Sequence, residues 1–218
     1  MQLKEIAWIR RVAYIVRNFR NKHSYTSGRN NRIRNTGGIR VGSRIQISGN
    51  GNVVVIENNA LLLNSLIHII GDNNRVVLKS KSYVSGAELW VENNQCSLIV
   101  GERTFIGNKS HLACTEDGIQ LVIGDDCMIS SSVQIRTGDS HSILDMEGQR
   151  INPAHSVKIG NHCWLGQGCR ILKGGELGEN VIVSTGAIVT KVFGDNVLVG
   201  GIPAQVLREN VTWESRRI

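Results

Sequence analysis

The sequence has little proline and few aromatic residues. Its 218 residues include 2 Pro and 5% Phe, Trp and Tyr, against 24 Gly. This composition is unusual for a globule with an aromatic core and is typical of a turn-rich repeat protein. No run of about 18 apolar residues is present, so the sequence predicts no membrane-spanning helix. The longest apolar run near the N-terminus, residues 12–16, is shorter than the roughly 7–15-residue core of a secretory signal. We therefore expect a cytoplasmic protein.

The sequence also lacks any Cys-x-x-Cys pair, and its cysteines are odd in number. Neither a disulfide framework nor a metal site is indicated, because both need a second convergent pair. The cysteines are therefore predicted to be small buried apolar residues in a reducing compartment: Cys96, Cys114, Cys127, Cys163 and Cys169.

Acidic residues are almost absent from the first 44 positions. Eleven Lys and Arg lie there with Glu5 as the single acid, whereas the rest of the chain holds 14 basic and 17 acidic residues. Residues 3–20 have helical spacing, with Ile6, Ile9, Ala13 and Val16 on one side, which predicts a short basic N-terminal helix. Two roles remain open for it. It is expected to cap a solenoid core, or to contact an anionic membrane surface or an acidic polymer.

Residues 159–193 repeat with a period of six. Neither a helix, with period 3.6, nor a flat strand, with period 2, fits this pattern. Six-residue repeats predict a solenoid in which three short strands make one triangular coil. The first position of each repeat is a branched aliphatic residue expected to point into the core: Ile159, Leu165, Ile171, Leu177, Val183 and Val189.

Residues 38–107 show a looser repeat marked by Asn-rich turns. Asn52, Asn74 and Asn94 recur at intervals that are slightly longer than three hexapeptides. Because three hexapeptides make one triangular coil, we interpret this region as imperfect early coils with an extra turn. Asn and Gly tolerate the backbone conformation that tight corners need.

The six-residue frame breaks at residues 136–158. An insertion of this kind leaves a solenoid on one face and often builds its binding site. His141 lies in it, with Asp139 and Asp145 on either side. A neutral imidazole takes a proton near pH 7, and a carboxylate on its second nitrogen would fix the tautomer. The loop is therefore the predicted place of chemistry.

Several of these features together resemble the left-handed β-helix acyltransferases: the hexapeptide repeats, the histidine loop, IGNHCWLGQG, VSTGAIVTK and GGIPAQVLR. RTGDSHSI and RINPA are similar to the branch that O-acetylates capsule and O-antigen sugars. The resemblance covers residues 98–210 well and 1–97 poorly. It implies an all-β fold, a left-handed parallel β-helix over 38–204 with loop 136–158 protruding. A basic N-terminal helix or cap segment (1–37) would precede it and a C-terminal tail (205–218) would follow.

The resemblance also implies roles for single residues. His141 matches the general base for direct transfer from acetyl-CoA, and Trp164 matches a tryptophan beside it. The implied coenzyme contacts are Gly166, Gln167, Thr185, Thr190, Lys191, Pro203, Ala204 and Arg208. The implied acceptor contacts are Asn108, Ser110 and His111.

The chain departs from the family pattern at two positions. Ile202 stands where Asn is usual, and Gln205 stands where Lys or Arg is usual, so one phosphate contact is expected to be missing. Carbonic anhydrases of the same rod fold bind zinc through three histidines, two of which lie five residues apart. No His pair here has that spacing, and no metal is predicted.

We therefore predict an acetyl-CoA-dependent O-acetyltransferase of a bacterial surface polysaccharide or its precursor, an acidic one in view of the basic N-terminus. The expected partners are a glycan acceptor and two further copies in a homotrimer, with peripheral contact to inner-membrane assembly machinery left open. No nucleic acid partner is expected. An N-acetyltransferase of an amino sugar or xenobiotic is the alternative enzyme, and a non-catalytic solenoid scaffold is the alternative of another class.

Overall fold

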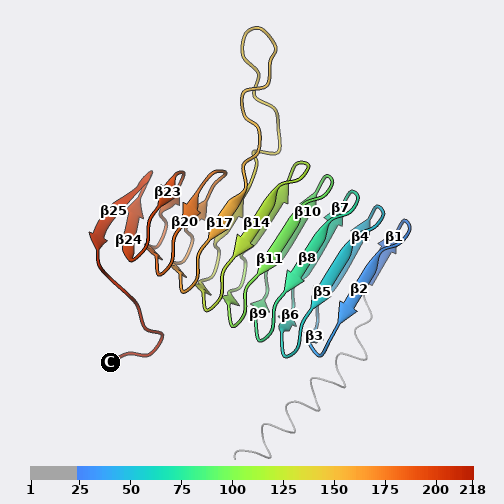
Figure 1. Cartoon of the computed structure of the whole chain (residues 1–218), viewed down its shortest axis with the longest axis horizontal. Coiled ribbons are helices and arrows are strands. Elements are labelled where there is room, and N and C mark those ends of the chain that lie inside the picture. The colour runs from blue at the N-terminus through green and yellow to red at the C-terminus, as the bar shows by residue number, and fades with distance from the viewer. Residues whose placement is uncertain (1–23) are drawn as a thin grey trace, which may run out of the picture.

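The computed structural model describes residues 24–218, and Figure 1 shows that this part of the chain winds into an elongated solenoid. Its 25 strands form three sheets, and all strand pairs are parallel except the last. Sheet A contains β1 (Ser24–Ser27), β4 (Arg44–Ser48), β7 (Leu66–Ile70), β10 (Glu88–Glu92), β13 (His111–Thr115), β16 (Gln134–Arg136), β19 (Arg170–Ile171) and β22 (Ile188–Val189). Sheet B contains β2 (Arg32–Asn35), β5 (Val53–Ile56), β8 (Arg75–Leu78), β11 (Ser97–Val100), β14 (Gln120–Ile123), β17 (Val157–Ile159), β20 (Glu176–Leu177) and β23 (Val192–Phe193). Sheet C contains β3 (Ile39–Val41), β6 (Leu61–Leu63), β9 (Tyr83–Ser85), β12 (Phe105–Ile106), β15 (Met128–Ile129), β18 (Trp164–Leu165), β21 (Ile182–Val183), β24 (Val197–Gly201) and β25 (Ala204–Glu209).

Each coil passes through one strand of sheet A, then B, then C. We name the turns between them the A–B, B–C and C–A corners. The aliphatic residues that begin the six-residue repeats are buried, as are the five cysteines, none of which forms a disulfide. Fully burying one such aliphatic side chain contributes about 1.5–3 kcal/mol. The predicted hexapeptide-repeat solenoid is confirmed.

The early coils are larger than the late ones, as the Asn spacing predicted. In sheet A, Arg44 pairs with Leu66, whereas Arg170 pairs with Ile188, which is a shorter step along the chain. The difference follows from strand length, since the early strands of sheets A and B are longer than the late ones. Buried asparagines also stack between early coils: Asn52 Oδ1 accepts the backbone N–H of Asn74 at 2.9 Å. The ladder satisfies buried backbone donors at these corners.

Two predicted boundaries need correction. The solenoid already includes Ser24, because β1 pairs with β4 and β2 pairs with β5, so it does not begin at residue 38. The predicted tail 205–218 contributes most of β25, which pairs antiparallel with β24. The predicted N-terminal helix lies outside the described residues. Within residues 24–218 no helix is long and apolar enough to cross a membrane.

Candidate active site

The insertion predicted at residues 136–158 protrudes from the A–B corner between β16 and β17 (Figure 1). Its tip is a hairpin, since Leu144 and Arg150 form an antiparallel bridge. The Asp145 carboxylate accepts the backbone N–H groups of Glu147 at 3.1 Å and Gln149 at 2.7 Å. Asp145 Oδ1 therefore closes the hairpin turn. The predicted role of Asp145, orienting the His141 imidazole, is not supported in the single chain.

Asn152 fixes the base of the loop. Its side chain is buried and donates to Asp139 Oδ2 and to the backbone carbonyl of His141, both at 2.9 Å. Its Oδ1 accepts the backbone N–H of Ile143 at 2.7 Å. One buried amide thus holds the backbone at His141 and Ile143 and the side chain of Asp139.

Charged residues of neighbouring coils support this anchor. Lys173 Nζ lies 2.5 Å from Asp139 Oδ2 and donates to the Asn152 carbonyl at 3.3 Å. The hydrogen bonds from Lys173 and from Asn152 hold the pKa of Asp139 below its usual value. Glu116 forms a bidentate ion pair with Arg150, whose hydrogen bond likewise lowers the pKa of the Glu116 carboxyl. The loop is therefore pinned to the rod at its stem.

His141 is one of the residues that line a pocket of about 230 Å³, and its side chain is exposed. Within residues 24–218 the imidazole has no hydrogen-bond partner, and the predicted orienting carboxylate of Asp139 is engaged by Lys173 and Asn152. The imidazole is thus left accessible while its backbone is fixed. The other lining residues are Glu92, Asn93, Thr115, Glu116, Ser140, Ser142 and Arg150.

Trp164 lies on a different face, the outer side of sheet C, and its side chain is 37% exposed. Its ring centroid is 6.0 Å from that of Trp213, which stacks on His162 at 4.6 Å. The C-terminal segment therefore packs against this face. The described residues show no contact between Trp164 and His141, so one chain does not bring the two predicted residues together.

The predicted coenzyme residues fall into two groups. Gly166 and Gln167 lie at the C–A corner of one coil, Thr185 at that corner of the next, and Pro203 follows β24 at the same corner. A Cβ added at Gly168 or Gly186 would meet nothing within 4 Å. The outer side of this corner is therefore open to an elongated ligand, which fits the predicted acetyl-CoA contact.

The second group lies elsewhere. Thr190 and Lys191 are at the A–B side of the last coil, where Lys191 Nζ donates to Gln205 Oε1 at 2.9 Å. Arg208 is exposed on β25, opposite Leu198. Ala204 is buried in the core, so its side chain is not available to a nucleotide.

The predicted acceptor residues lie at the C–A corner of an earlier coil. Asn108 is exposed and accepts the Ser85 hydroxyl at 3.0 Å, and His111 is half-buried at the start of β13. Ser110 is 1% exposed. Its hydroxyl donates to the Ser130 carbonyl and accepts the Val133 N–H. We therefore correct its predicted role, because this hydroxyl serves the contact between coils.

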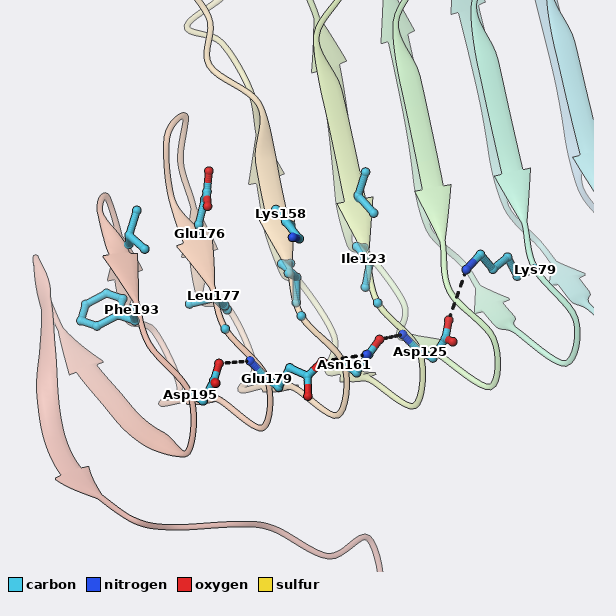
Figure 2. Close-up of a pocket in the computed structure, with 16 residues that line it drawn as sticks. Lys79, Ile123, Asp125, Lys158, Asn161, Glu176, Leu177, Glu179, Phe193 and Asp195 are labelled. Carbon is cyan, nitrogen blue, oxygen red and sulfur yellow. Dashed lines mark hydrogen bonds and ion pairs between the residues drawn. The ribbon is translucent and has the colours of Figure 1, made fainter.

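A larger hollow, of about 480 Å³, lies over sheet B beside the B–C corner (Figure 2) and is lined by none of the predicted site residues. Side chains along its edge join successive coils. Asn161 Oδ1 accepts the Asp125 N–H at 2.8 Å, and Asp195 Oδ1 accepts the Glu179 N–H at 2.7 Å. These bonds hold the corner turns together, a structural role.

Sequence reasoning missed the residues that hold the loop, namely Asn152, Lys173, Glu116 and Arg150. Asn152 and Arg150 belong to the RINPA segment that contributed to the family resemblance, so a signal existed for them. Lys173 and Glu116 lie 34 residues from their partners. Only the stacking of coils brings them together, and the sequence carried no signal for this.

Comparisons with known proteins place the chain in a family. No protein-family model matches it. The polysialic acid O-acetyltransferase of Neisseria meningitidis is 34% identical over 195 residues, covering 88% of this chain and 89% of that protein. The crystal structure of the polysialic-acid-specific acetyltransferase NeuO has a TM-score of 0.82 at 27% identity, with 88% of each chain covered. That of the polysialic acid O-acetyltransferase OatWY has a TM-score of 0.81 at 30% identity, covering 90% of this chain and 92% of the other.

A solenoid with an accessible histidine on a protruding loop and a corner open to an elongated ligand is compatible with acyl transfer. With the relatives just described, the chain belongs to the hexapeptide-repeat acyltransferase family, in its polysaccharide O-acetyltransferase branch. It is an enzyme, and the predicted family is confirmed.

Proposed function

We propose that this enzyme transfers the acetyl group of acetyl-CoA to a hydroxyl of an acidic, sialic-acid-type surface polysaccharide or its precursor, in the cytoplasm. The observation that carries the proposal is the similarity to a polysialic acid O-acetyltransferase over 88% of the chain. Charge supports it as well. Residues 24–44, which are the first described coil and the first residue of β4, carry five arginines and no acid, which favours a polyanionic acceptor: Arg29, Arg32, Arg34, Arg40 and Arg44.

His141 is the proposed general base. It takes the proton of the acceptor hydroxyl while that oxygen attacks the thioester carbonyl carbon, forming the ester bond as the carbon–sulfur bond breaks. The proton is then available for the departing thiolate. Transfer is direct, and the open C–A corner holds the coenzyme beside the acceptor, so that positioning adds to base catalysis.

We further propose that the enzyme is a homotrimer whose sites form between copies. Support comes from an apolar row on the outer face of sheet C. Its eight residues, one per strand of that sheet from β3 to β24, stand in register along the rod: Ile39, Leu61, Tyr83, Phe105, Met128, Trp164, Ile182 and Leu198. A second copy lying on this row would remove it from water. The same contact would bring Trp164 toward the His141 loop of a neighbour, which one chain does not achieve.

Replacing Phe105 by Glu is expected to convert the trimer into monomers and to abolish activity, because a charge buried in an apolar contact is strongly destabilising. Light scattering after size-exclusion chromatography measures the mass. Ile99→Glu, an equivalent change on the outer face of sheet B, is the control and should remain trimeric. A Phe105→Glu trimer with full activity would rule out this face as the interface.

The proposed reaction is tested by incubating the protein with labelled acetyl-CoA and a panel of acceptors. The panel contains polysialic acid, a neutral galactoside and an amino sugar. Label is expected on polysialic acid and should be released by mild alkali, as an ester is. Alkali-resistant label on the amino sugar would establish N-acetylation instead. No transfer to any acceptor would favour a non-catalytic scaffold.

A further inference from the structure

A groove of about 350 Å³ runs along the C–A corner of the early coils. Its lining side chains include Arg44, Asn64, Glu88, Lys109 and His111. Arg44, Glu88 and His111 occupy one row of sheet A, in register through Leu66. The row thus crosses four neighbouring strands, about 14 Å at the usual strand spacing. The groove is long enough for more than one sugar ring.

Some charged side chains in the groove have a partner of opposite charge nearby and others do not. Arg44 and Lys109 are exposed, and within residues 24–218 neither forms an ion pair. Glu88 faces His111, with 3.9 Å between Oε2 and Nε2. Burial lowers the pKa of His111 against the opposing charge of Glu88, and the charge of Arg136 lowers it further, so His111 acts near pH 7 as a neutral hydrogen-bonding group. With His111 neutral, the two cations Arg44 and Lys109 outnumber the single carboxylate of Glu88, which leaves a net positive charge that attracts anions.

The groove continues the line of the proposed coenzyme path. Gln167 and Thr185 lie at the C–A corner of the late coils, and Asn108 lies at the same corner in the turn that ends the groove at Lys109 and His111. One corner of the rod thus carries the coenzyme residues toward its C-terminal end and an open cationic groove toward its N-terminal end. The early coils form that groove.

We propose that this groove is an acceptor subsite, in which Arg44 and Lys109 pair with the carboxylates of anionic sugar units outside the one that is acetylated. The inference rests on the proposed function. In this proposal the early coils bind the polymer, whereas His141 and the late coils carry out the acetyl transfer. Charge-assisted hydrogen bonds from a guanidinium and an ammonium group match a carboxylate.

The test compares Arg44→Gln and Lys109→Gln with the wild-type enzyme on two acceptors: polysialic acid longer than the groove, and a sialic acid disaccharide. Each variant is expected to raise KM for the long acceptor by about threefold to tenfold, since one charge-assisted contact is lost. KM for acetyl-CoA and for the disaccharide should stay unchanged. The rise of KM with salt should also be shallower, because fewer charges are left to screen.

Two further variants sharpen the result. Arg75→Gln removes an exposed arginine from sheet B and should leave KM unchanged. Glu88→Gln removes the acid from the groove and should lower KM for the long acceptor by about twofold. If wild-type enzyme acetylates polysialic acid but Arg44→Gln and Lys109→Gln behave like Arg75→Gln, the subsite is wrong and the function stands. If wild-type enzyme acetylates no glycan, the function itself fails.

Discussion

Replacing His141 by Ala is expected to lower kcat by about 10²–10⁴-fold, the usual contribution of a positioned general base. Acetyl-CoA binding should be unaffected, because Gly166, Gln167 and Thr185 lie at the C–A corner and the substitution removes only the imidazole of a loop residue at the A–B corner. The exposed imidazole makes no hydrogen bond within the described residues, so the fold should not change. Steady-state kinetics on polysialic acid and calorimetric titration with CoA measure the two effects.

The matched control for His141 is His155→Ala. His155 is an exposed histidine of the same loop, and its backbone N–H, which the substitution keeps, donates to the Thr137 carbonyl at 2.9 Å. This variant should retain wild-type kcat. Turnover by His141→Ala at the rate of His155→Ala would show that another group is the base.

Replacing Asn152 by Ala is expected to lower kcat by about tenfold to a hundredfold. The substitution leaves the Ile143 N–H without its acceptor and frees the His141 carbonyl, and each part-buried hydrogen bond lost contributes about 0.5–1.5 kcal/mol. The backbone that carries the base would then adopt several conformations. Limited proteolysis should cut residues 137–156 faster than in wild-type enzyme, while the trimer and the melting temperature of the rod are kept.

Gln149→Ala is the control for Asn152. Gln149 lies in the same hairpin, where its backbone N–H and carbonyl form hydrogen bonds with Asp145. The substitution keeps both backbone groups. This variant should keep both kcat and protease resistance. An Asn152→Ala enzyme with unchanged kcat would mean that the loop stem does not control the position of His141.

The fold could be predicted because the six-residue period is a property of the sequence alone. Ile159, Leu165 and Ile171 lie on three consecutive strands, one in each sheet, and all three are buried in the core. The N-terminal boundary was placed too late, at residue 38, because β1 and β2 carry arginines and polar residues in place of the aliphatic repeat. Pairing with β4 and β5 includes them in the sheets, a long-range effect that local pattern does not show.

The candidate site was predictable only in part. The break in the repeat located the loop and His141, but the neighbours of His141 in sequence, Asp139 and Asp145, were misleading. Asp145 closes a turn, and Asp139 binds Lys173 from the following coil. Trp164 and His141 belong to the same coil, the one from β16 to β18, yet they occupy different faces of the rod. The predicted proximity of Trp164 and His141 therefore requires a second copy of the chain. The sequence of one chain carries no information on how two copies are arranged.

The central claim is that this protein acetylates hydroxyls of an acidic polysaccharide with acetyl-CoA. Mass spectrometry of polysialic acid after incubation with the purified enzyme and acetyl-CoA tests it most directly. We predict added acetyl groups that alkali removes, formed by wild-type enzyme and by His155→Ala but not by His141→Ala. The account would be contradicted if the mass of polysialic acid stayed unchanged after incubation with a folded trimer that binds the coenzyme.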